Sequence, residues 1–155
     1  MKLYLIGTAH SFQKRLRCAP SACSDEFKNF VVYAAVCHSV RTIGEELSKS
    51  VLGTDVISLC AEVAGELSIS HLYCDPDNAE RVAAGLPVED CPSTWGPREE
   101  EWLARLDINE FPVLFVCGAN HVDSFAEKCR ARGIAVEVLK HDWEPSVSVD
   151  GNTII

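Results

Sequence analysis

Long hydrophobic runs are missing from this sequence of 155 residues. The apolar run that contains VVYAAV at positions 31–36 is far shorter than the roughly 20 residues that a membrane-spanning helix needs. The opening residues, MKLYLIGTAH, are too short for the hydrophobic part of a signal peptide and contain no small-residue cleavage site. We therefore expect a cytoplasmic protein with no membrane partner.

Basic residues are also scarce. The chain has 14 Lys and Arg against 23 Asp and Glu, a formal net charge of −9, which argues against broad binding to nucleic acid. The exception is the segment 1–24, whose charged residues are all basic: Lys2, Lys14, Arg15 and Arg17. The last three lie in HSFQKRLR, which we interpret either as a solvated loop or as a collar that binds an anionic substrate or partner.

Closely spaced cysteine pairs are almost absent, although the chain has eight cysteines. Cys18 and Cys23 form the one close pair, and no second pair completes a zinc site. Reduced thiols therefore fit better than a disulfide framework, and a structural zinc at Cys18 and Cys23 is the alternative. Four cysteines lie in apolar segments, where we expect small buried side chains: Cys37, Cys60, Cys74 and Cys117.

The hydrophobic content of 47% and the charged content of 24% are typical of one globular domain, residues 1–155. Strand-like and helix-like segments alternate along it. Strands are predicted at 2–6, 42–47, 68–74, 111–117 and 134–139, and helices at 24–40, 55–67, from 97 onward and at 122–132. We expect an exposed loop at 85–97 and an irregular tail at about 141–155. The alternation predicts an α/β fold with a mostly parallel sheet of four to five strands and helices on both faces.

Polar residues gather where the predicted strands end. In parallel sheets, functional groups lie beyond the carboxyl ends of the strands, so these residues are the candidates for a site. Two strands are followed by G-x-x-H motifs, GTAH and GANH, which end at His10 and His121. The other groups are acidic: Glu45 and Glu46 at the end of the second strand, and Asp75 and Asp77 after the third.

Two imidazoles with a carboxylate can hold a divalent transition metal such as Zn, Mn or Co, and such a metal activates water. The ligands would be His10, Glu46 and His121. Without metal, a histidine–carboxylate pair could act as a general base. We expect the glycine of each motif to let the chain turn sharply as it leaves the sheet. The ordinary interpretation is that each histidine simply bonds to a backbone carbonyl.

The two G-x-x-H motifs resemble the paired signature of the TraB/TIKI superfamily, which includes the ChaN-like and erythromycin-esterase-like proteins. Members usually carry a glutamate near the second strand end and an arginine that opens a later helix. Here IGEEL supplies Glu45 and Glu46, and PREEEWLARL supplies Arg98, so the order His, Glu, Arg, His is kept.

The resemblance implies an α/β core in which these residues converge on one cleft. His10 and His121 would be metal ligands or bases, Glu45 or Glu46 their carboxylate partner, and Arg98 would orient a carboxylate or stabilise negative charge. TIKI-type members are metal-dependent proteases, erythromycin esterases activate water on a lactone, and ChaN-like members are associated with haem or iron. The chain differs from the family pattern because only the loop 85–97 replaces a long helical insertion, which leaves the substrate class open.

Three functions follow from these residues. The first is a small hydrolase that acts on a small-molecule or peptide substrate through a His/Glu site, with metal-assisted activation of water as the favoured form. The second is a non-catalytic binding or regulatory module that uses Lys14, Arg15 and Arg17. The third is a magnesium-dependent phosphoesterase that uses Glu45, Asp75 and Asp77. The oligomeric state is left open.

The remaining polar and aromatic residues have two interpretations each. Asp75 would line the site or serve in a turn, and Arg98 would serve the site or form a surface ion pair. Asn120 would donate to an oxyanion or cap the next helix, and we favour the cap. We expect Trp102 in the core and Trp95 at a pocket mouth.

Overall fold

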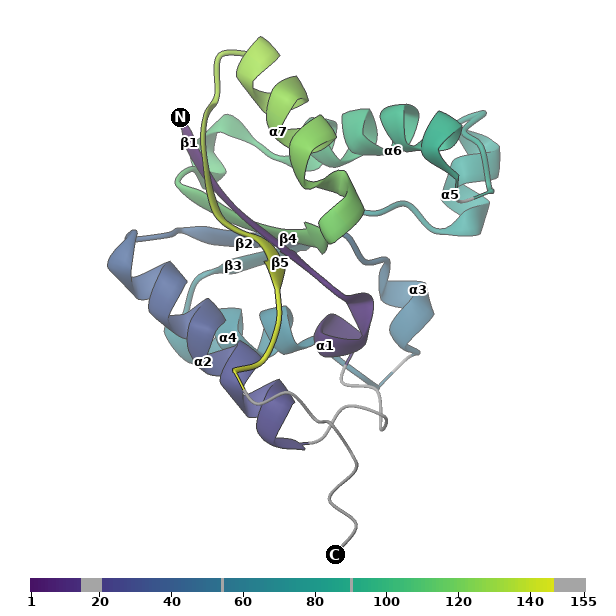
Figure 1. Cartoon of the computed structure of the whole chain (residues 1–155). Helices are drawn as coiled ribbons and strands as arrows, with labels where there is room; N and C mark the ends of the chain where they lie inside the picture. Colours follow the sequence, from purple (N-terminus) through teal and green to yellow (C-terminus); the bar gives the residue numbers. More distant parts are fainter. Residues whose placement is uncertain (15–20, 54, 90, 147–155) are drawn as a thin grey trace, which may run out of the picture.

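Five parallel strands form one sheet, in the order β3-β2-β4-β1-β5 (Figure 1). The computed structural model describes residues 1–14, 21–53, 55–89 and 91–146. The strands are β1 (Lys2–Thr8), β2 (Thr42–Glu45), β3 (Ser70–Tyr73), β4 (Val113–Gly118) and β5 (Ala135–Trp143). The prediction of a single-domain α/β fold with a parallel sheet is confirmed.

Helices cover both faces of this sheet. They are α1 (His10–Lys14), α2 (Ser21–Cys37), α3 (Lys49–Leu52), α4 (Leu59–Leu67), α5 (Asn78–Ala83), α6 (Pro92–Arg105) and α7 (Val122–Ala131), with short 3₁₀ turns η1 (Ile108–Glu110) and η2 (Ala119–His121). Helices α2 and α4 pack on one face, and α6 and α7 on the other (Figure 1). No helix in the described ranges combines the length and hydrophobicity of a membrane span.

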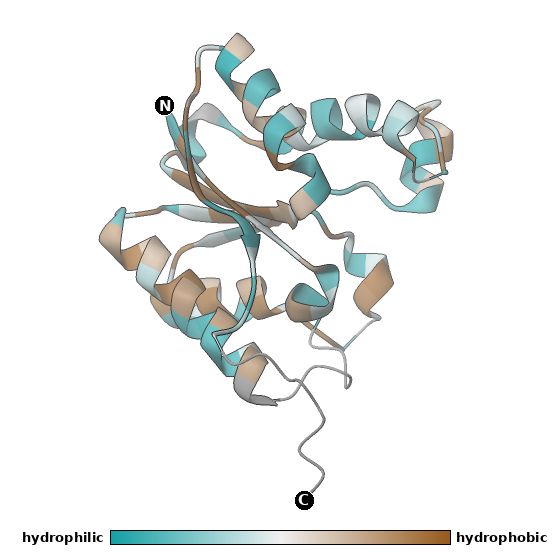
Figure 2. Cartoon of the chain, in the orientation of Figure 1, coloured by the Kyte–Doolittle hydropathy of each residue, from teal (hydrophilic) through white to brown (hydrophobic). Residues whose placement is uncertain are grey.

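The core has two halves, because successive side chains of a strand point to opposite faces. In β4, Leu114 joins Phe27 of α2 on one face, while Phe115 joins Trp102 of α6 and Phe125 of α7 on the other. All six residues of β4 are buried, as expected for a strand covered on both sides. Hydrophobic residues accordingly concentrate on the central strands and the inner helix faces (Figure 2).

The boundaries of α2, α4 and α6 differ from the sequence prediction, and α2 spans Ser21–Cys37 rather than 24–40. Helix α4 begins at Leu59 rather than at residue 55, because Ser58 caps it by accepting a hydrogen bond of 3.0 Å from the Ala61 N–H. Helix α6 begins at Pro92, inside the stretch 85–97 that was predicted as a loop, with Pro92 at the first position where a missing N–H is tolerated. Arg98 therefore lies within the helix instead of opening it.

The predicted irregular tail is wrong at residues 141–143. These residues continue β5 beside the end of β1, where Thr8 pairs with Trp143. The Trp143 side chain is buried against the rings of Phe12 and Phe27, at centroid distances of 5.1 and 4.8 Å. Burying a large aromatic ring is enough to extend the strand.

The connections place a crevice at the carboxyl ends of the central strands. The chain leaves β1 and β2 toward the α2/α4 face, but it leaves β4 toward the α7 face (Figure 1). Loops that depart to opposite faces open a switch point, where sheets of this class bind ligands. The residues that follow β1, β2 and β4 meet there.

The described cysteines are all free thiols. Cys60, Cys74 and Cys117 are buried as predicted, whereas Cys37 is exposed because it lies at the outer side of the α2 end. Cys18 lies outside the described residues. Burial raises the pKa of the Cys74 thiol to about 12, while a hydrogen bond with Ser93 lowers the pKa of Cys91.

We expect iodoacetamide to modify the native protein at Cys37 and Cys91 well before the buried Cys60, Cys74 and Cys117, because only an accessible thiolate reacts. Peptide mass spectrometry over time measures each rate, with urea-unfolded protein as the control in which all sites react. The rate at Cys91 should reach half its maximum at a lower pH than that of an unperturbed thiol. Equal rates at Cys91 and Cys117 would contradict the burial pattern.

Candidate functional site

Glu46 is the centre of the polar network at the switch point. It follows β2 and continues the ladder to β4, because its N–H donates to the carbonyl of Val116 at 2.9 Å. Its carboxylate is turned toward the end of β4, where Oε2 accepts a hydrogen bond of 2.8 Å from the Gly118 N–H. The residue is only 3% exposed, so its charge depends on the groups around it.

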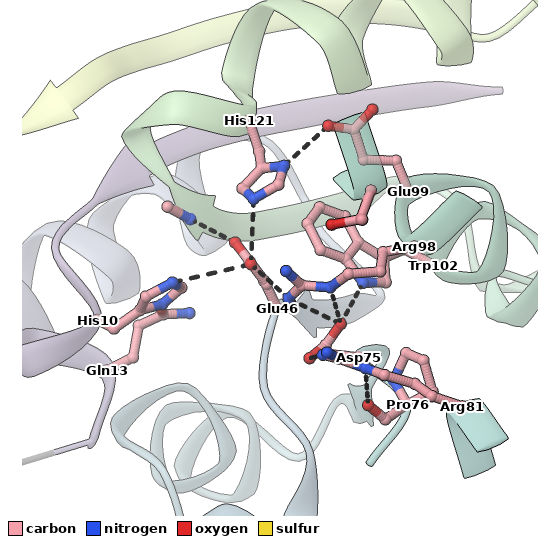
Figure 3. A network of polar contacts seen from close by, with 12 residues as sticks. His10, Gln13, Glu46, Asp75, Pro76, Arg81, Arg98, Glu99, Trp102 and His121 are labelled. Carbon is pink, nitrogen blue, oxygen red and sulfur yellow. Dashed lines mark hydrogen bonds and ion pairs between the residues drawn. The ribbon is translucent and has the colours of Figure 1, made fainter. Parts of the chain in front are cut away.

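Three side chains converge on the second oxygen of Glu46 (Figure 3). Oε1 lies 3.7 Å from Nε2 of His10, 3.4 Å from Nε2 of His121 and 3.0 Å from Nη2 of Arg98. These are the His, Glu, Arg and His that the motifs singled out, and the structure brings them together. They come from α1, the end of β2, α6 and η2, four segments that are far apart in sequence.

The orientation of His10 is set by Gln13, one turn later in α1. The Gln13 amide nitrogen donates to the Val116 carbonyl at 3.3 Å and to Glu45 Oε2 at 3.5 Å, so its oxygen faces His10. Nδ1 of His10 therefore donates to Gln13 Oε1, at 2.8 Å. This tautomer leaves Nε2 of His10 with the lone pair that faces Glu46.

His121 has the same arrangement, with a carboxylate in place of the amide. Its Nδ1 lies 2.8 Å from Oε1 of Glu99, which is fully buried in α6 and also accepts a hydrogen bond of 2.5 Å from Ser124. The other Glu99 oxygen has no hydrogen-bond partner among the described residues, with Lys128 Nζ at 3.8 Å. A carboxylate on Nδ1 fixes the tautomer and makes Nε2 more basic.

Burial raises the pKa of the Glu46 carboxyl, and this effect outweighs the two imidazoles, the Gly118 N–H and Arg98, which lower it. A carboxyl of raised pKa beside two imidazoles with free Nε2 atoms is suited to proton transfer. The oxygen of Glu46 that both imidazoles face also accepts a hydrogen bond of 3.0 Å from Arg98 Nη2.

Arg98 joins this centre to a second buried carboxylate, Asp75, which follows β3. Arg98 donates to Asp75 Oδ1 from Nε at 3.2 Å and from Nη2 at 3.1 Å. Oδ1 also accepts from the Trp102 indole at 2.9 Å, and Oδ2 from Arg81 at 2.6 Å. Arg98 is 4% exposed, so it is not a surface ion pair. Asp75 is held by donors on both oxygens and anchors Arg98, and it also lines a small pocket beside His10.

The prediction that Glu45 belongs to the catalytic group needs correction. As the last residue of β2 it points to the face opposite Glu46. There it is fully buried, bonded to Ser58 and at 2.7 Å from Nε2 of His71. Glu45 accepts a hydrogen bond of 3.5 Å from Gln13, the residue that orients His10, so Glu45 supports the site indirectly.

Two pockets meet at His10. A pocket of about 310 Å³ is lined by His10, His121, Trp95, Asn120 and residues of the β1 and β5 ends. A pocket of about 140 Å³ on the other side is lined by His10, Glu46, Arg98 and Lys14. Lys14 therefore lies beside the site, and Trp95 lines a pocket as predicted. Arg15 and Arg17 lie outside the described residues.

Neither motif glycine is needed for a turn, because neither has a positive φ. Both allow close packing instead. A Cβ on Gly118 would lie 3.2 Å from His10 Nε2 and 3.3 Å from Glu46 Oε2, so glycine lets the site atoms approach. A Cβ on Gly7 would lie 1.9 Å from the carbonyl oxygen of His141 in β5.

Two other predicted roles change. Asn120 does not cap α7. The N-cap residue is His121, whose side chain makes no capping hydrogen bond. Asn120 is exposed and lines the larger pocket. Asp77 caps α5 in a capping box with Glu80, which occupies its carboxylate. Gln13 and Glu99, the two residues that orient the histidines, were not predicted from the sequence.

Two imidazole nitrogens and a carboxylate oxygen are ligand types that suit a divalent transition metal. Nε2 of His10 and of His121 faces Glu46, and each Nδ1 is bonded to an acceptor, as in histidines that bind metals. Within the described residues, however, no three His, Cys, Asp or Glu side chains already stand in the arrangement of a metal site. Arg98 occupies the Glu46 oxygen that both histidines approach.

No protein-family model, curated protein sequence or solved structure matches this chain.

Proposed function

We propose that the protein is a small hydrolase of the TraB/TIKI-like type, in which His10, Glu46 and His121 activate water. The observation that carries the proposal is the convergence of both Nε2 atoms on one buried oxygen of Glu46, at 3.7 and 3.4 Å. Two histidines serving only as hydrogen-bonded core residues would not need to face the same carboxylate beside a pocket. The paired G-x-x-H motifs support the same conclusion.

His121 is the general base in this proposal. Because Glu99 holds its Nδ1, Nε2 can take a proton from a water molecule in the larger pocket, and the water oxygen then attacks a carbonyl carbon of the substrate. Glu99 and Glu46 stabilise the imidazolium that forms. His121 returns the proton to the leaving group, and His10, at the meeting point of both pockets, positions the reacting atoms.

A divalent transition metal such as Zn, Mn or Co would be held by His10, Glu46 and His121. When bound, it would supply a water of lowered pKa and polarise the carbonyl. The Nδ1 partners Gln13 and Glu99 orient the same two nitrogens whether or not a metal takes part.

The magnesium phosphoesterase alternative is less well supported by the contacts of its carboxylates. Asp75 is bonded by two arginines and an indole, Asp77 caps a helix, and Glu45 faces the opposite side of the sheet. The binding-module alternative keeps one supporting observation, the position of Lys14 in the smaller pocket.

The test is hydrolysis of p-nitrophenyl acetate, p-nitrophenyl butyrate and a simple lactone by untagged protein, with metal content measured by mass spectrometry. We expect His121→Ala to lower kcat/KM by about 100-fold, the lower end of the effect of losing a general base. His141→Ala is the matched control, because His141 is exposed and pairs with Asp123 outside the site, so its activity should be unchanged.

Full activity in His121→Ala, with folding verified by circular dichroism, would contradict the proposed base. Metal bound to the wild type and lost in the double variant His10→Ala/His121→Ala supports the metal-assisted form. Equal substoichiometric metal in both proteins would remove that form and leave the histidine base.

A further inference from the structure

The lining of the larger pocket carries a negative charge that ester hydrolysis alone does not require. Its described lining includes the carboxylate residue Asp142, the aromatic residue Trp95 and the two histidines, but no Lys or Arg. At about 310 Å³ it is at the small end of ligand pockets, large enough for one ring or a short chain.

Asp142 faces this pocket because of its place in β5. The next residue, Trp143, packs on the α2/α4 face against Phe12 and Phe27. Asp142 lines the pocket together with the end of β1 and η2, and its neighbour His141 contacts Asp123 in the first turn of α7 at 3.0 Å. Asp142 is exposed there, and it brings a negative charge to the rim.

Trp95 forms an aromatic wall on the other side. It lies in the first turn of α6, and its ring centroid is 4.5 Å from that of His121 at an interplanar angle of 54°. The half-buried indole is thus fixed beside the reacting groups. An indole face next to a carboxylate is the combination that attracts organic cations.

The charges behind the histidines are paired, so they do not oppose a cation in the pocket. Glu46 contacts both imidazoles and Arg98, and Glu99 contacts His121, with Lys128 Nζ at 3.8 Å from the other Glu99 oxygen. The closest arginine at the site, Arg98, is bonded to Glu46 and Asp75. Lys14 lines the smaller pocket instead, on the far side of His10.

We propose that the pocket between Trp95 and Asp142 binds an organic cation, an ammonium or guanidinium group carried by the substrate, with Asp142 as the specificity-determining residue. Where it concerns a substrate, the proposal rests on the proposed hydrolase function. Cation binding itself does not, because it needs only the pocket. Lys14 repels the same group from the smaller pocket, so the charge also orients the molecule across His10.

The test is binding of benzylammonium, benzyl alcohol and benzoate, three probes of similar size and different charge, to the full chain. The Trp95 indole N–H signal in ¹H–¹⁵N NMR spectra, assigned with Trp95→Phe, reports occupancy of the pocket. We expect benzylammonium to bind about tenfold more tightly than benzyl alcohol, and benzoate more weakly than either.

Asp142→Asn should reduce the ratio of the benzylammonium and benzyl alcohol affinities toward one, and Asp142→Lys should make benzoate the best of the three ligands. Asp123→Asn is the matched control, since Asp123 is 87% exposed and does not line the pocket, and it should keep the wild-type ratio. Equal affinities in the wild type, no detectable binding, or a ratio unchanged by Asp142→Asn would overturn the proposal.

The two proposals fail separately. Absence of ester hydrolysis together with Asp142-dependent binding of benzylammonium would reject the hydrolase and keep the cation site. Hydrolysis that depends on His121, without charge discrimination in the pocket, would do the reverse.

Discussion

Replacing Arg98 with methionine is expected to lower the free energy of unfolding by about 3–5 kcal/mol, the range seen when one partner of a buried ion pair is removed. Arg98 is the cation shared by Glu46 and Asp75, and all three side chains are at most 10% exposed. Methionine fills a similar volume but leaves Glu46 without its guanidinium. Urea denaturation followed by circular dichroism measures the change.

Arg105→Met is the matched control for this experiment. Arg105 lies two turns later in α6 and pairs with Glu101 and Glu80, but its side chain is 27% exposed. Screening by solvent limits such pairs to less than about 1 kcal/mol. A similar loss in both variants would show that the buried network contributes no more than a surface pair. Adding Glu46→Gln to Arg98→Met should recover part of the loss, since Glu46 is the carboxylate left without a guanidinium, whereas Asp75 keeps Arg81 at 2.6 Å.

The convergence of His10, Glu46 and His121 follows from information that is local in the sequence. Apolar segments alternating with helices predict parallel strands, and parallel strands bring their carboxyl ends to one edge. Each of the three residues follows such a strand within a few positions. The edge is therefore predictable, and only the order of the strands decides which ends are neighbours.

The choice between Glu45 and Glu46 depends on strand parity, which the sequence alone leaves open. In β2, Ile43 packs into the α2/α4 half of the core, and Glu45 points to the same side. Gly44 faces the ring of Phe115 on the other side, and Glu46 follows it there. Knowing which face Ile43 occupies would have decided the question, but both faces of this sheet are hydrophobic.

Glu99 was missed because the start of α6 was placed too late. Among three consecutive glutamates at 99–101, nothing distinguishes one until the helix is extended back to Pro92. Trp95, Arg98, Glu99 and Trp102 then fall at helical spacing on one face, which is the face toward the sheet and the site. The proline-rich composition of 85–97 suggested a loop, although Pro92 stands at a position that favours a helix start.

Asp142 was missed for a different reason. The residues around it alternate poorly between polar and apolar, and Glu144 and Pro145 follow immediately. What extends β5 to this point is tertiary, the burial of Trp143 against two phenylalanines from the first thirty residues. A contact of that range leaves no local pattern in the sequence.

Replacing Gly7 with alanine is expected to destabilise the protein by about 3 kcal/mol or more, at or above the upper end of ordinary overpacking. The new Cβ would lie 1.9 Å from the His141 carbonyl oxygen and 2.5 Å from Val122 Cγ2, and the first of these is backbone that cannot rotate away. Relief would require β5 to move away from β1, at the register shift that lies between Ile6 and Thr8.

Gly65→Ala makes the same chemical change in α4, where no atom lies within 4 Å of the added Cβ. This variant should instead stabilise the protein by roughly 0.5–1 kcal/mol through helix propensity. Thermal or urea unfolding compares the two variants directly. Equal stability of Gly7→Ala and Gly65→Ala would mean that β5 does not lie against Gly7 as described, and the positions of Trp143 and Asp142 would then have to be revised with it.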